Sequence, residues 1–122
     1  MLFIKKNTIN RLAEPYKEPD MFTCYAMSQS FASVTSRAVL LMNHKKIIVL
    51  FLNAFSSRVV QKIEFPFNGL ENSKLRSGIL LSAIWSFDFK GDKWRFSIIK
   101  KIMTLGTMQG DFLRVLKQNL KG

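Results

Sequence analysis

Residues that could perform catalysis are few and scattered in this chain. His44 is the single histidine and Cys24 the single cysteine, and neither has a candidate partner beside it. A nucleophilic cysteine needs a nearby base, and zinc usually takes a set of Cys and His ligands. We therefore expect no catalytic residue, no metal site and no cofactor. His44 is expected to be a solvated turn residue, and Cys24 a buried, apolar one.

Two carboxylates, Asp88 and Asp92, flank a Lys90-Gly91 pair. Paired carboxylates can perform acid–base chemistry. Lys90 and Lys93 lie beside them, however, so charge balance at a hairpin tip is the simpler interpretation. The sequence therefore favours a protein that is not an enzyme.

Basic residues give the strongest chemical signal. Lysine and arginine number 19 against 8 acidic residues, for a formal net charge of +11, and such a balance favours anionic partners. Arg95 should point away from Trp94 and Phe96, and two lysines follow the end of the same strand. The candidate anion-binding patch consists of Lys93, Arg95, Lys100 and Lys101. The alternative is a generally basic surface without a specific site.

The patch depends on a hairpin formed by two runs with alternating apolar residues. Residues 79–89 and 94–98 each show a period of two, which is typical of strands with one apolar face. A turn at 90–93, with Gly91 and Asp92 at its centre, should join them. The expected facing pairs are Phe89 with Trp94, Phe87 with Phe96, and Trp85 with Ile98, so that all six side chains share one face.

Five more strands are expected upstream, at residues 21–31, 34–42, 46–52, 58–64 and 70–77. The runs 34–42 and 46–52 are apolar on both faces, which predicts central strands covered on each side. Asn43 should allow the turn between them, because asparagine tolerates a left-handed conformation. Pro66 should break the strand that precedes it, since proline lacks a ladder donor.

Helices are expected only near the ends of the chain. Residues 1–19 form an N-terminal extension in which a short helix is plausible before Pro15 and Pro19. Thr107 is a candidate N-cap for a second helix. The apolar face of this helix consists of Met108, Phe112, Val115 and Leu116, with Leu113 and Leu120 at its margin.

These elements predict one mainly β domain over residues 1–122, with its core at 20–122. About seven short antiparallel strands cannot leave their inner face wet, so they should form a sandwich or partly open barrel. The C-terminal helix should close the open end, with Phe112 and Leu116 facing the layer that contains Trp85 and Phe96.

The order of elements resembles the bacterial pleckstrin-homology (PH)-like domains, particularly the YokE-like group. The resemblance covers roughly residues 20–120 and is one of pattern and strand order. It is carried by Ala38–Phe51, Ile63–Phe67, the run through Gly78-Ile79-Leu80, Trp94–Ile98 with Lys100-Lys101, and Met108–Leu113. It implies two near-orthogonal antiparallel sheets capped by a C-terminal helix, and some members of the group form rings or other oligomers. Eukaryotic relatives hold phosphoinositides with basic residues in the first loop between strands; the corresponding stretch here, Met27 to Arg37, has Arg37 as its one base.

The function predicted from the sequence is a non-catalytic binding or assembly module that acts through protein–protein contacts or self-association, with a homo-oligomer as one form. The alternative is peripheral binding to anionic lipid or nucleic acid through the basic patch. Nucleic acid is favoured less, because the aromatic residues alternate inward and leave no stacking platform. The lone cysteine, the absence of a signal-like start and the short apolar run Ile47–Leu52 favour a cytoplasmic protein.

Overall fold

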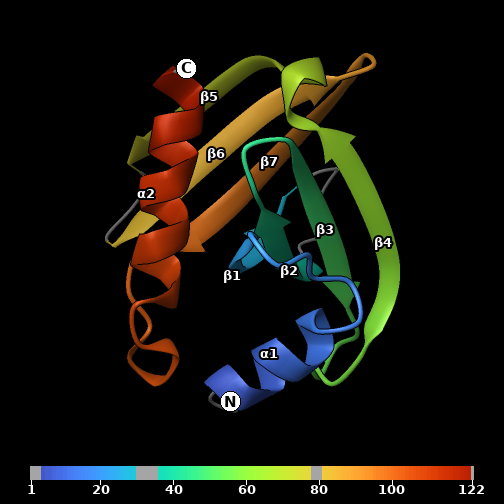
Figure 1. The fold of residues 1–122 in the computed structure, drawn as a ribbon, viewed down its shortest axis with the longest axis vertical. Coiled ribbons are helices and arrows are strands. Elements are labelled where there is room, and N and C mark those ends of the chain that lie inside the picture. Colours follow the sequence, from blue (N-terminus) through green and yellow to red (C-terminus); the bar gives the residue numbers. More distant parts are fainter. Residues whose placement is uncertain (1–3, 30–35, 78–80, 122) are drawn as a thin grey trace.

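The computed structural model describes residues 4–29, 36–77 and 81–121, with two α-helices and seven strands (Figure 1). The expected strand residues at 30–31, 34–35 and 79–80 lie outside this part of the chain. The α-helices are α1 (Lys6–Ala13) and α2 (Met108–Lys121), and the strands are β1 (Phe22–Ser28), β2 (Ser36–Met42), β3 (Lys46–Leu52), β4 (Val59–Pro66), β5 (Glu71–Ser77), β6 (Ser82–Phe89) and β7 (Asp92–Ile99). Two short 3₁₀ helices, Phe67–Gly69 and Met103–Leu105, complete the order.

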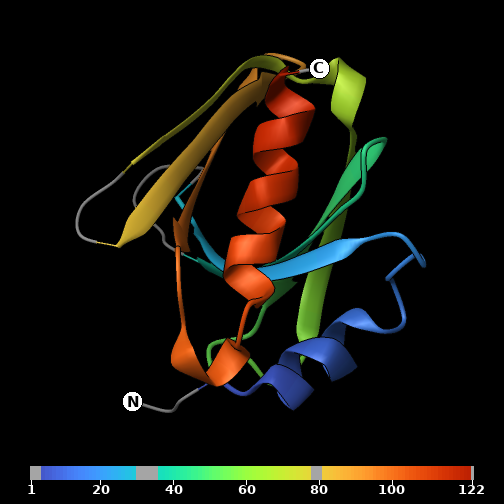
Figure 2. The ribbon, with the colours of Figure 1, turned by 60° about the vertical axis from the view of Figure 1, so that its left-hand side comes forward.

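The strands are antiparallel and hydrogen-bonded in the order β4-β3-β2-β1-β7-β6-β5. Among the described residues, the shortest ladder is that between β1 and β7, with the pairs Met27–Ser97 and Ser28–Phe96. The strands on the two sides of this junction face each other, and α2 lies across the opening between them (Figure 2). The expected mainly β fold, with about seven antiparallel strands capped by a C-terminal helix, is confirmed. The two expected sheets are the two halves of this continuous strand order.

Gln109 of α2 joins β1 to β7 where their ladder ends. Its side chain is fully buried. Its Oε1 accepts a hydrogen bond from the Tyr25 N–H (2.7 Å), and its Nε2 donates to the carbonyl oxygens of Tyr25 (2.8 Å) and Ile99 (2.9 Å). In the register of the ladder, Tyr25 and Ile99 lie two residues beyond the Met27–Ser97 pair and would form the next hydrogen-bonded pair. The Gln109 amide therefore takes the place of the missing strand-to-strand bonds.

The larger apolar cluster fills the space between the two halves of the sheet. It includes Trp85, Phe87, Trp94, Phe96 and Ile98, and it also holds Phe112, Leu113 and Leu116 of α2 and the inward residues of β2 and β3, with Phe89 packed against it. The prediction that the aromatic hairpin residues share one face, and that α2 packs on that face, is confirmed.

The register of the β6–β7 hairpin differs from the prediction by two residues. Phe87 lies opposite Trp94, and Trp85 lies opposite Phe96. The turn consists of two residues, Lys90 (φ 50°) and Gly91 (φ 86°), and two positive φ values fit the right-handed twist of the flanking strands. Asp92 is consequently the first residue of the next strand and not part of the turn. A shift by two residues keeps every side chain on its face, so the buried layer is unchanged.

A second apolar cluster covers the opposite face of β2 and β3. It contains Val39 and Leu41 of β2 and Ile48 and Leu50 of β3, packed with Ile9, Leu12 and Ala13 of α1 and with Leu105 and Met108. Both expectations are confirmed: the short N-terminal helix exists, and the two central strands are buried on both faces. Helix α1 packs on the apolar side chains of β2 and β3 that face away from the larger cluster.

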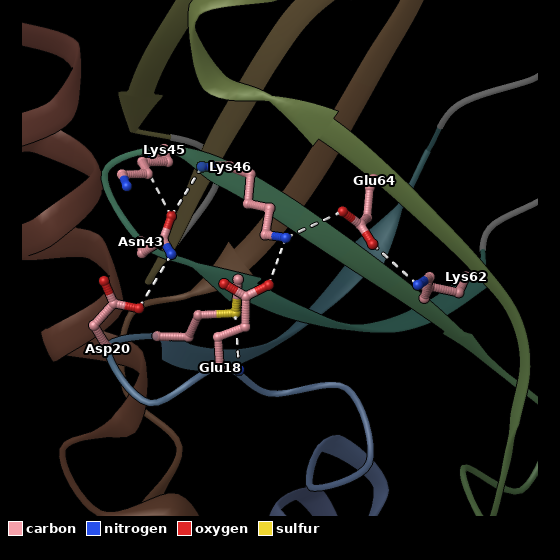
Figure 3. A network of polar contacts seen from close by, with 8 residues as sticks. Glu18, Asp20, Asn43, Lys45, Lys46, Lys62 and Glu64 are labelled. Carbon is pink, nitrogen blue, oxygen red and sulfur yellow. Dashed lines mark hydrogen bonds and ion pairs between the residues drawn. The ribbon is translucent and has the colours of Figure 1, made fainter.

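Asn43 forms the turn between β2 and β3 through its side chain. Its φ is not positive, so the expected left-handed conformation is wrong. Its Oδ1 instead accepts hydrogen bonds from the backbone N–H groups of Lys45 (2.8 Å) and Lys46 (2.9 Å), and its Nδ2 donates to Asp20 Oδ1 (3.1 Å), as Figure 3 shows. Asparagine commonly stabilises turns in this way.

The expected break at Pro66 is confirmed, since β4 ends at this residue, although the proline itself still belongs to the strand. Phe67 N–H donates to the Lys45 carbonyl (2.7 Å), and Lys46 lies opposite Pro66. In an antiparallel ladder, bonded and non-bonded pairs alternate, so the position of the Pro66 nitrogen points away from β3. Proline therefore costs no hydrogen bond to β3, in keeping with its preference for edge strands.

A polar network joins the segment after α1 to β3 and β4 (Figure 3). The Lys46 ammonium contacts the Glu18 carboxylate and lies 3.4 Å from Glu64 Oε1, while Lys62 Nζ lies 3.0 Å from Glu64 Oε2. The hydrogen bond from Lys62 lowers the pKa of Glu64 below its ordinary value. The hydrogen bond to Glu18 raises the pKa of Lys46.

Replacing Glu64 with glutamine should produce a small, pH-dependent loss of stability. A carboxylate with a lowered pKa stabilises the fold above its unfolded-state pKa, and this contribution disappears as the pH falls through the folded-state value. Because the Glu64 side chain is 40% exposed, the loss at pH 7 should be at most about 1 kcal/mol. Urea unfolding at pH 7 and at about pH 3 measures this loss of stability, with Glu71→Gln as the exposed control. A difference that persisted unchanged at the lower pH would contradict the ionic origin.

Candidate anion-binding site

The outer face of β5, β6 and β7 contains a shallow depression of about 390 Å³. Two arginines, Arg76 from β5 and Arg95 from β7, contribute its positive charge. Its other lining residues are Gln29, Ser77, Ser82, Ile84 and Ser97. Strand pairing explains this arrangement, because Arg76 lies opposite Ile84 and Ile84 lies opposite Ser97. Arg76, Ile84 and Ser97 alternate along their strands with residues that are buried in the larger cluster or packed against it, so these three side chains face outward.

The four residues of the predicted patch do not form one site. Arg95 lines the depression, on the face opposite Trp94 and Phe96 as expected. Lys100 reaches its rim, where Nζ donates to Ser77 Oγ (3.3 Å). Lys93 lies 4.0 Å from Asp88 Oδ1, so its charge is partly balanced at the other end of the hairpin. Lys101 is exposed and does not line the depression.

The sequence prediction missed Arg76 and the serines. Arg76 lies in β5, which the sequence predicts only as a weak strand. Its alternation with Leu75, a residue packed against the larger cluster, indicates that Arg76 faces outward. What the sequence does not show is that β5 pairs with β6 and so brings Arg76 to the same face as Arg95.

The charge on this face is unevenly distributed along the strands. Near the β6–β7 turn, Asp88 accepts a hydrogen bond from Asn72 (2.8 Å) and lies near Lys93. At the other end, the lining of the depression includes no carboxylate among the residues that the structure describes. Arginine presents several N–H donors in a fork that matches oxyanions, and serine hydroxyls can add further donors. The arrangement therefore suits a small oxygen-bearing anion such as a phosphate group.

Cys24 and His44 lie where the sequence predicts them. Cys24 is fully buried in the larger cluster, and burial raises the pKa of its thiol well above the ordinary value. His44 is exposed in the turn between β2 and β3. In the described part of the chain, no group of three or more His, Cys, Asp or Glu residues is placed to hold a metal ion.

Comparison with known proteins places the fold but not the family. No protein-family model matches the chain, and no curated protein matches it. Among solved structures, the chain is similar to the hSac2 domain from the human phosphoinositide phosphatase Sac2, with a TM-score of 0.54 and 11% sequence identity over 91% of this chain and 78% of that one. At this identity the similarity concerns the fold alone. None of the helices over residues 4–29, 36–77 and 81–121 is long and apolar enough to cross a membrane.

Proposed function

We propose that the protein is a non-catalytic binding module of the PH-like type, whose depression on the outer face of β5, β6 and β7 binds the phosphate group of an anionic lipid. The observation that supports this proposal is that Arg76 and Arg95 line one depression, with no carboxylate among its described lining residues. The PH-like assignment, with its resemblance to the YokE-like group, belongs to the same proposal. It is supported by the strand order and the capping helix. A cytoplasmic location would give this face access to the acidic cytoplasmic leaflet of a membrane.

The shape of the site favours a lipid headgroup over a nucleic-acid strand. A strand of nucleic acid requires a long basic groove, and usually aromatic side chains on which bases stack. The aromatic residues of β6 and β7 belong to the interior cluster, and the depression is short. A membrane surface, by contrast, presents single phosphate groups to a shallow basic pocket and adds about 1 kcal/mol for each nearby Lys or Arg.

Vesicle sedimentation tests the proposal. The Arg76→Ala/Arg95→Ala double variant should lose about 2 kcal/mol, or roughly 30-fold, in binding to phosphatidylcholine vesicles that contain anionic phospholipid. The matched control, Arg11→Ala/Arg58→Ala, removes two exposed arginines and leaves the same net charge. It should bind nearly as well as the wild type.

Three outcomes would contradict this assignment. Equal losses in the two double variants would indicate a generally basic surface without a site. Absence of vesicle binding at low ionic strength would refute lipid binding altogether. Binding to single-stranded or duplex DNA without vesicle binding, measured by gel shift at two salt concentrations, would favour the nucleic-acid alternative, because phosphate contacts weaken steeply with salt.

Protein–protein contact or self-association is the second candidate function. It is favoured by the two ends of the sheet, where β4 and β5 each have one edge that pairs with no other strand of the described residues. Exposed edges can pair with a strand of another chain unless the protein blocks them. Either function is compatible with the other, because the depression and the outer edge of β4 lie in different halves of the sheet.

A further inference from the structure

The outer edge of β4 carries backbone groups that face away from the sheet. The Phe67–Lys45 hydrogen bond and the register of β3 with β4 set the alternation along β4. Ile63 and Phe65 bond to β3, while the N–H and C=O groups of Lys62 and Glu64 point outward. Within the described residues, no strand pairs with this edge, and it forms the open right-hand margin of the fold in Figure 1.

The length of this edge is limited at both ends. The register of β3 and β4 shifts between Phe51 and Leu52, opposite Val60, and such a bulge bends the strand and interrupts regular pairing. Pro66 ends the strand and has no N–H to donate. The regular edge therefore consists of residues 61–66, and Ile63 lies near its centre.

The charges on this edge are complementary to themselves. If a second copy of β4 lay antiparallel with Ile63 opposite its own counterpart, Lys62 would face the partner's Glu64, and Glu64 would face the partner's Lys62. In this register the outward N–H and C=O groups of both residues also meet in bonded pairs. Oppositely charged residues that face each other across strands stabilise the pair, whereas like charges destabilise it. In the single chain, Lys62 already contacts Glu64 (3.0 Å; Figure 3), so both side chains lie on the same face of the strand.

The other open edge, β5, has the opposite character. The same antiparallel arrangement centred on Leu75 would place Lys74 opposite the partner's Arg76 and repeat that repulsion by symmetry. The strand is also irregular, because Asn72 has a positive φ (53°) and the register with β6 shifts between Glu71 and Lys74. Of the two edges, β4 is thus the one that fits a second copy of this chain.

We propose that two copies of the chain form a two-fold symmetric dimer by antiparallel pairing of their β4 strands, centred on Ile63. The occupant of the β4 edge is a second copy, because a two-fold interface requires a self-complementary surface, and residues 62–64 supply one. This proposal develops the second candidate function and is independent of the anion site.

Charge reversal tests the pairing. Sedimentation velocity over a range of protein concentrations should show a monomer–dimer equilibrium for the wild type. Lys62→Glu and Glu64→Lys should each weaken dimerisation by about tenfold or more, since symmetry places two like-charge contacts in each homodimer. An equimolar mixture of the two variants should form a heterodimer, because all contacts between the chains are then attractive. Lys117→Glu makes the same charge change as Lys62→Glu at an exposed position of α2, and this variant should dimerise like the wild type.

The mixture separates a contact between chains from a folding defect. Neither variant regains its own Lys62–Glu64 pair on mixing, so recovery of the dimer can come only from the contact between copies. A wild type that stayed monomeric at every concentration would refute self-association itself. If neither charge reversal weakened the dimer, self-association would be supported, but the proposed pairing of the β4 strands would be refuted. Larger assemblies would indicate head-to-tail pairing and would refute the two-fold arrangement.

Discussion

Replacing Gln109 with alanine should lower the free energy of unfolding by about 3 kcal/mol or more. The substitution removes three hydrogen bonds at a fully buried position and leaves the Tyr25 N–H and two backbone carbonyls without partners. A buried polar group without a partner costs about 1–3 kcal/mol, and small domains have only about 5–15 kcal/mol in total. Urea unfolding followed by circular dichroism measures the change.

Two comparisons make this prediction specific to the amide. Gln118→Ala changes an exposed glutamine of the same helix and should alter stability by less than about 0.5 kcal/mol. Gln109→Met keeps the length and volume of the side chain but not its hydrogen bonds, so it should be nearly as unstable as Gln109→Ala. Hydrogen exchange should quicken at the Tyr25 amide in both Gln109 variants. If Gln109→Met were as stable as the wild type, packing and not the hydrogen bonds would explain the role of the residue.

Replacing Phe112 with alanine should destabilise the fold by about 3–5 kcal/mol. Phe112 is fully buried in the larger cluster, where α2 closes the opening between the halves of the sheet. Removing its ring forfeits the burial of a large apolar side chain and leaves a cavity that the surrounding strands can fill only in part. Thermal and urea unfolding both report the loss.

A graded series along α2 tests whether this effect follows burial. Val115 is only partly buried, so Val115→Ala should cost clearly less than Phe112→Ala. Lys117 is exposed, and Lys117→Ala should be within about 0.5 kcal/mol of the wild type. Similar losses in all three variants would indicate that helix propensity, and not packing against the sheet, governs the stability of α2.

The sequence predicts the buried face of the hairpin better than its register. Alternation assigns Trp85 and Trp94 to the interior whatever the pairing, because a shift by two residues preserves the face. The register depends on which residues make the turn. The turn is Lys90-Gly91, and a lysine with positive φ is uncommon. The residue types of this segment therefore did not indicate that Lys90 is one of the two turn residues. Asp92, with a residue type typical of turns, is instead the first residue of β7.

Contacts between distant segments account for what the sequence did not predict. Gln109 lies on the buried side of α2 with Leu113 and Leu116, which follow it by four and seven residues, and a polar residue in such a position indicates a buried hydrogen bond. Its partner, Tyr25, is far away in the chain, and no local pattern connects them. The same reason explains the missed Arg76, whose place beside Arg95 depends on how β5 pairs. Lys93 and Lys101, which are near Arg95 in sequence, do not line the depression.

The order of the strands has a consequence for how the chain folds. Every pairing in the sheet joins strands that follow one another in sequence, except that of β1 with β7. The consecutive hairpins can therefore form early, since they close short loops, whereas bringing Met27 to Ser97 closes a long one at a greater entropic cost. We therefore expect the pairing of β1 with β7 to be the slowest step of folding, and Gln109, which secures it, is synthesised only after both half-sheets.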